Sequence, residues 1–155
     1  LLVLGPFMPA ELQNDFMERA AELDRVDVIT FDSRIESLMA RAAGIVAMGG
    51  YNTFCEILSF DKRALIVPRT EPRMEQYIRA ARAEELGITA MLVDDGERDP
   101  DVMSEALRRL PSQLTPSETM ESGLLDGLEE VNRLAQNWLY GQGPTAKVAV
   151  LRREA

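Results

Sequence analysis

Short apolar segments alternate with amphipathic segments along most of this chain, and this alternation limits the folds open to it. The apolar segments are rich in Val, Ile, Leu and Ala and are expected to be strands at residues 1–4, 26–31, 45–48, 64–67 and 90–93. The amphipathic segments have a helical period and are expected to be helices at residues 9–23, 34–42, 52–60, 73–86 and 101–110. Apolar strands without polar alternation are typical of parallel sheets covered on both faces. The pattern therefore predicts an α/β fold: a doubly wound, Rossmann-like parallel sheet of about five to six strands, with helices on both faces.

The same pattern divides the chain into a main domain and a C-terminal extension. A length of 155 residues suits one domain with a substantial core. We expect that domain at residues 1–110, a polar linker at 111–116, and a C-terminal helix of the same domain at 117–140. The apolar residues of this helix share one side, namely Leu124, Leu128, Val131, Ala135, Trp138 and Leu139. Residues 141–155 form a tail for which no structure is predicted.

Charge and residue usage exclude several function classes. Seventeen basic and 26 acidic residues give a net charge of −9, so nonspecific binding to nucleic acid or to an anionic membrane is not expected. The chain has no histidine, and its single cysteine, Cys55, cannot form an internal disulfide. The Asp94–Asp95 pair resembles part of an acidic metal site, but aspartate is also favoured in turns. We expect neither a metal nor a cofactor, and we expect a cytoplasmic protein.

The ligand of a doubly wound fold binds beyond the carboxyl ends of the strands. The loops to consider are therefore residues 5–8, 32–34, 49–53 and 69–76.

The loop with the clearest chemistry is the Gly49–Gly50 pair between a strand and a helix. Glycines allow close backbone approach, and a helix N-terminus offers free N–H groups to a phosphate. Asn52 or Thr53 can cap the helix or donate to a phosphate oxygen, and Glu56 suits a pair of sugar hydroxyls. A purely structural interpretation stays open here: a tight turn with Thr53 as the cap and Glu56 in solvent.

Three segments in this order carry a family resemblance: residues 42–56, 64–68 and 73–80. They contain a small-Gly-x-x-Thr-x-x-Glu motif after a strand, a strand ending in Pro68, and a loop with Gln76 followed by Ala80. Together they resemble the C-terminal domain of GT-B glycosyltransferases. The resemblance is greatest to the family 28-like group that includes the peptidoglycan N-acetylglucosaminyltransferase and the monogalactosyldiacylglycerol synthases. It covers about residues 1–110.

The resemblance implies a role for each matching position. In the second half of the domain, Gly49, Gly50 and Thr53 would bind the donor diphosphate, Glu56 the ribose hydroxyls, and Gln76 the donor sugar. In the first half, Gly5 would approach the diphosphate, and the 32–34 loop, with Arg34, would line the base pocket. The full set of candidate donor-binding residues is Gly5, Arg34, Gly49, Gly50, Asn52, Thr53, Glu56 and Gln76.

Two loops depart from the family pattern. Glu75 and Arg79 stand where relatives often have Asp and Asn, so the identity of the donor sugar is not indicated. Pro6 and Phe7 stand where relatives have a loop rich in Gly or Ser.

The resemblance implies an inverting, metal-independent transfer of a hexose or N-acetylhexosamine to an acceptor hydroxyl. Its donor would be a nucleoside-diphosphate sugar, a UDP-sugar in particular. In the family, the catalytic base and the acceptor site belong mainly to an N-terminal domain. The strand expected at the very start of the chain, Leu1–Leu4, suggests that such a domain is missing, so the fragment alone should be inactive.

Several alternatives stay open. The chain can be half of a UDP-sugar 2-epimerase, which shares the two-domain architecture, or a non-catalytic nucleotide-binding or interaction domain. Peripheral membrane association through the missing half and a homodimer are both left open, and no nucleic-acid partner is expected.

Overall fold

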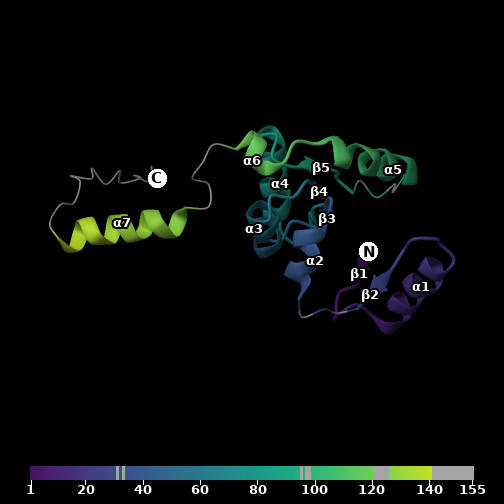
Figure 1. Ribbon diagram of the computed structural model, residues 1–155. Coiled ribbons are helices and arrows are strands. Elements are labelled where there is room, and N and C mark those ends of the chain that lie inside the picture. Colours follow the sequence, from purple (N-terminus) through teal and green to yellow (C-terminus); the bar gives the residue numbers. More distant parts are fainter. Residues whose placement is uncertain (31, 33, 95, 97–98, 121–125, 141–155) are drawn as a thin grey trace, which may run out of the picture. The chain divides into compact units, whose positions relative to one another are not determined.

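A computed structural model describes residues 1–30, 32, 34–94, 96, 99–120 and 126–140 (Figure 1). The chain forms two compact units, Leu1–Ala42 and Ala43–Ala155. Each unit is described by itself below.

The first unit is a strand–helix–strand arrangement followed by a second helix. Strand β1 (Leu2–Val3) pairs in parallel with β2 (Val28–Ile29), and helix α1 (Ala10–Ala21) connects them. Helix α2 (Ile35–Arg41) follows. Among the described residues of this unit, the buried side chains are Leu4, Ala20 and Met39.

The second unit contains a three-stranded parallel sheet in the order β3-β4-β5. The strands are β3 (Ile45–Ala47), β4 (Ala64–Ile66) and β5 (Ala90–Met91). The central strand β4 is entirely buried, and its side chains are at most 1% exposed. Burial on both faces explains why its sequence lacks the polar alternation of a half-exposed strand.

Each of these strands is followed in the chain by a helix (Figure 1). The helices are α3 (Tyr51–Ser59), α4 (Glu75–Glu85) and α5 (Pro100–Arg109). Leu58 of α3, Ala83 of α4 and Ile88 form a buried cluster, and Phe54 and Met120 pack against it. Gly87, with φ of +70°, ends α4 as a helix-terminating glycine. Asp99 begins α5, because its side chain accepts a hydrogen bond from the Asp101 N–H.

The predicted α/β class with parallel strands separated by helices is confirmed, but the sheet differs from the expected one. Five strands are found in the described residues, in one sheet of two and one of three. Each strand is also shorter than its apolar segment. After β4, for example, Pro68 has no N–H to continue a ladder.

The region expected to be a polar linker at 111–116 is packed against other parts of the second unit. The 3₁₀ helix η1 (Leu110–Ser112) follows α5 directly, and Leu110 and Pro116 are buried. The Arg63 Nε donates to the Gln113 carbonyl oxygen at 2.6 Å, which holds this segment to the start of β4.

A single helix over residues 117–140 is not what the structure has. The short helix α6 (Pro116–Thr119) ends before Met120, which is extended with ψ of 140°, and helix α7 (Gly127–Leu139) is separate. Helix α6 is fixed by its own cap: Thr115 and Glu118 form a capping box, and both Asp61 oxygens bind Ser117. Because Met120 then packs on the Leu58 cluster, the chain leaves the helical path.

Helix α7 carries an exposed apolar side that includes Leu128, Val131, Trp138 and Leu139. Leu124, expected on the same side, and the tail at 141–155 lie outside the described residues. No helix in the described part of the chain is long and apolar enough to cross a bilayer.

Candidate functional site

The loops after β3 and β4 leave the same edge of the second unit's sheet. Ala47 pairs with Ile66 at the ends of these parallel strands, and the Val67 N–H donates to the Ala47 carbonyl oxygen at 2.9 Å. The residues that follow, Met48–Gly50 and Val67–Arg69, are therefore neighbours at the carboxyl end of the sheet. This is the edge at which such folds bind ligands.

Gly49 is required by the fold itself. Its φ is +73°, and a Cβ added there would lie 2.7 Å from the Ile66 Cγ2. Any larger residue would be strained in conformation and would collide with a fully buried side chain. Close approach of a ligand is therefore not needed to explain this glycine.

Gly50 differs from Gly49, because nothing in the fold requires it to be glycine. Its φ is −54°, and no atom lies within 4 Å of the place where a Cβ would be. Among the described residues, the space in front of Gly50 is open.

Helix α3 begins at Gly50 without a side-chain cap. The first intrahelical bond runs from the Phe54 N–H to the Gly50 carbonyl oxygen at 2.8 Å. The N-cap residue is a glycine and so supplies no side-chain cap, and the first turn has no acidic residue. The structural interpretation with Thr53 as the cap is therefore not what the structure shows. The positive end of the α3 dipole is not neutralised from within the first turn.

The polar side chains expected around this terminus are present at different depths. Asn52 is exposed, and Thr53 and Glu56 are half-buried. Thr53 and Glu56 are three residues apart and so lie on one face of α3. Among the described residues, the Glu56 carboxylate has no hydrogen-bond or ion-pair partner.

Gln76 lies in the first turn of α4 and binds the neighbouring loop. Its Oε1 accepts a hydrogen bond from the Arg69 N–H at 3.0 Å. This contact fixes the amide's orientation and leaves its NH₂ group as a donor. Gln76 thus lies at the sheet edge that also carries Gly49 and Gly50.

Arg79 is the residue of this site whose role sequence reasoning missed. It is half-buried, its Nη1 donates to the Gly49 carbonyl oxygen at 2.8 Å, and its guanidinium carbon lies 5.6 Å from the centre of the Tyr51 ring. The sequence signals were its departure from the family pattern and its position three residues after Gln76, which puts both side chains on one face of α4.

Gly5 and Arg34 belong to the first unit. The Gly5 carbonyl oxygen accepts from the Met8 N–H at 3.1 Å and from the Gln13 Nε2 at 3.3 Å, which closes the turn after β1. Arg34 is the exposed N-cap of α2, and its N–H donates to the Asp32 Oδ1 at 2.7 Å. The structure groups Gly49, Gly50, Asn52, Thr53, Glu56 and Gln76 within the second unit.

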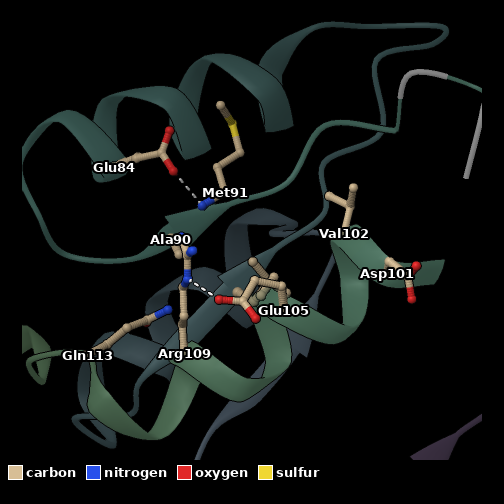
Figure 2. A pocket seen from close by; sticks show the side chains of 10 residues that line it. Glu84, Ala90, Met91, Asp101, Val102, Glu105, Arg109 and Gln113 are labelled. Atoms are coloured by element: carbon tan, nitrogen blue, oxygen red, sulfur yellow. Dashed lines mark hydrogen bonds and ion pairs between the residues drawn. The ribbon is translucent and has the colours of Figure 1, made fainter. Parts of the chain in front are cut away.

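A separate groove of about 630 Å³ lies between α4, β5 and α5 (Figure 2). It contains none of the predicted donor-binding residues. Two of its carboxylates are already paired: the Glu84 Oε1 accepts from the Met91 N–H at 2.8 Å, and Glu105 binds the Arg109 Nε at 2.8 Å. The Glu84 and Glu105 carboxylates thus serve the fold.

No group of three or more potential metal ligands gathers anywhere in the described part of the chain. Asp95, one half of the acidic pair noted in the sequence, lies outside that part.

Comparison with protein families decides the identity of the domain. The family model described as "Glycosyltransferase family 28 C-terminal domain" matches residues 1–137. The chain belongs to this family. No curated protein sequence matches this family 28 domain significantly.

A solved structure supports the fold of this family 28 domain. The structure titled "Spinosyn Forosaminyltransferase SpnP" is similar with a TM-score of 0.53 over 72% of the present chain, at 18% identity. The match covers 34% of that chain, so the family 28 domain corresponds to about a third of it. At this identity the likeness is one of fold, and it agrees with the parallel α/β arrangement.

Proposed function

We propose that this family 28 domain is the donor-binding part of a glycosyltransferase and that it holds a nucleoside-diphosphate sugar, specifically a UDP-sugar. The observation that carries the proposal is the uncapped start of α3 behind the open Gly50 backbone. Family membership supports the same proposal, since the site lies within residues 1–137, which match the family 28 domain.

The diphosphate would bind at the start of α3. The first intrahelical hydrogen bond is donated by the Phe54 N–H, so the N–H groups before it have no acceptor within the helix. Asn52 and Thr53, with an amide and a hydroxyl, belong to this same first turn. Such donors stabilise the charge that develops on a leaving diphosphate, and they do so without a metal ion. The chain's net charge of −9 is no obstacle, because local N–H groups bind the anion.

The rest of the donor would contact side chains further from the helix start. The half-buried, unpaired carboxylate of Glu56 suits the two ribose hydroxyls, which donate to it. The NH₂ group of Gln76 would donate to a hydroxyl of the hexose or N-acetylhexosamine. Gly5 and Arg34 lie in the first unit, and their roles in donor binding stay predictions from the family resemblance.

The reaction we propose is an inverting transfer of the sugar to an acceptor hydroxyl. It needs a general base to deprotonate the acceptor, and we assign that base to an N-terminal domain. The present chain by itself is proposed to bind the donor and transfer nothing.

Calorimetric titration of the full 155-residue chain with UDP, uridine and pyrophosphate tests this assignment residue by residue. Thr53→Ala should weaken binding of UDP and pyrophosphate and leave uridine unchanged. Glu56→Ala should weaken the binding of UDP and of uridine and leave the binding of pyrophosphate unchanged. Each loss should be about tenfold, as for one hydrogen bond involving a charged group.

Glu129→Ala is the matched control, because Glu129 is an exposed carboxylate of α7. GDP and TDP are titrated beside UDP to test the choice of base. If the folded wild-type chain bound none of these nucleotides, the donor-binding assignment would be wrong and the interaction domain would be favoured. Sugar transfer by the 155-residue chain alone would contradict the assignment of the base to another domain.

A further inference from the structure

Arg79 makes two contacts, one with the turn before α3 and one with the first residue of α3. It donates to the Gly49 carbonyl oxygen at 2.8 Å, and its guanidinium faces the Tyr51 ring at 5.6 Å. It thereby connects α4 to the residues on either side of Gly50.

The hydrogen bond to Gly49 also sets the direction of the next N–H group. A trans peptide is planar, so the Gly50 N–H points opposite to the Gly49 carbonyl. Because Arg79 holds that carbonyl towards α4, the Gly50 N–H is directed away from α4. A glycine pair without this contact would lose little by rotating the peptide, since glycine accepts many backbone conformations.

Two features make arginine suited to this position. It lines an apolar groove of about 510 Å³ between α3 and α4, together with Phe54 and Ile78. Its planar guanidinium can donate to a carbonyl and lie over an aromatic ring at the same time, which the ammonium of lysine does less well. In the part of the chain that is described, no carboxylate forms an ion pair with Arg79.

We infer that Arg79 is a positioning residue that holds the Gly49–Gly50 peptide in the orientation that binds the donor diphosphate. This inference rests on the proposed function. Arg79 acts through the Gly49 carbonyl, so its effect should fall on ligands that contain a diphosphate and not on the nucleoside.

The test uses the full chain and two arginines of the same helix. Arg79→Met removes the contact to Gly49, whereas Arg82→Met removes an exposed arginine that pairs with Glu85 at 2.8 Å and does not touch the turn. Both variants change the charge equally. Circular dichroism checks that each is folded.

We expect Arg79→Met to weaken binding of UDP and of pyrophosphate about tenfold, with uridine unchanged. Without ligand, the same variant should shift the ¹⁵N–¹H signal of the Gly50 amide. Arg82→Met should do neither. Arg79→Lys keeps the positive charge but not the planar guanidinium, so it should recover only a minor part of the affinity that Arg79→Met loses.

The outcomes separate this inference from the function on which it rests. If the wild-type chain binds neither UDP nor pyrophosphate, the proposed function fails and the inference fails with it. If the wild-type chain binds UDP and Arg79→Met binds it equally well, only the inference is overturned. Full recovery of affinity by Arg79→Lys would also overturn it, because Arg79 would then act by charge alone.

Discussion

Replacing Gly49 by alanine should destabilise the second unit strongly, and the structure gives the magnitude. The alanine would have to adopt φ of +73°, which costs about 1–2 kcal/mol for a residue with a Cβ. Its Cβ would also lie 2.7 Å from the Ile66 Cγ2, and overpacking of this kind costs about 1–3 kcal/mol. Ile66 is fully buried and branched at Cβ, so it cannot rotate away. The sum is roughly 2–5 kcal/mol.

Urea denaturation followed by far-ultraviolet circular dichroism measures this loss as a lower free energy of unfolding. Gly50→Ala is the matched control, because its φ is negative and its Cβ would meet no atom within 4 Å. It should change the free energy of unfolding by less than about 1 kcal/mol.

The clash and the backbone strain can be measured separately. Ile66→Ala removes the Cγ2, so Gly49→Ala introduced on that background should cost only the conformational part, about 1–2 kcal/mol. If Gly49→Ala were as stable as the wild type, the chain would not have the turn described here. If the two substitutions were additive, the contact with Ile66 would not explain the glycine.

Three further predictions concern stability. The Ser117 backbone N–H donates a hydrogen bond to the Asp61 carboxylate and lowers the pKa of that carboxyl from its ordinary value of 3.8. The ionised Asp61 therefore stabilises the folded chain above pH 3.8, and this stabilisation is lost as the pH falls through the lowered pKa of the folded state. The difference in unfolding free energy between the wild type and Asp61→Asn should accordingly shrink in acid, and a constant difference down to the acid limit would contradict this account. Gly44→Ala should lower the free energy of unfolding, measured by urea denaturation, by about 1–3 kcal/mol, because the new Cβ would lie 2.8 Å from Leu110 side-chain atoms. This cost should vanish when Leu110 is also replaced by alanine. Thr89→Val should raise the thermal midpoint and stabilise by about 1 kcal/mol, since the buried Thr89 hydroxyl has no hydrogen-bond partner among the described residues; a loss of stability would indicate a partner for that hydroxyl.

The candidate site shows which parts of a binding motif can be predicted from sequence. The strand–Gly-Gly–helix order placed Gly50 and Thr53 at the start of a helix, because glycine and the change of hydrophobic period are local signals. The reason for Gly49 was not local, since it depends on Ile66 in the neighbouring strand. The contact of Arg79 with the Gly49 carbonyl joins residues 30 positions apart, so no local pattern could reveal it.

The C-terminal region shows the same division. The apolar period correctly indicated a helix within residues 117–140, where α7 lies. The break at Met120 and the burial of Pro116 came instead from contacts with distant residues: Asp61 binds Ser117, and the Leu58 cluster receives Met120. Helical periodicity reports which residues share a face and does not report what that face meets.

The sequence by itself therefore determined the parallel α/β class, the family 28 motif and the residue types around the start of α3. Backbone propensity and hydrophobic period depend on residues close together in the sequence, so they can be recognised from the order of residues alone. Only the tertiary structure decided that Gly49 serves the fold while Gly50 stays open, and that Arg79 holds the peptide between them. Those facts depend on which side chains meet across β4 and α4, and a meeting of distant residues exists only in the folded chain.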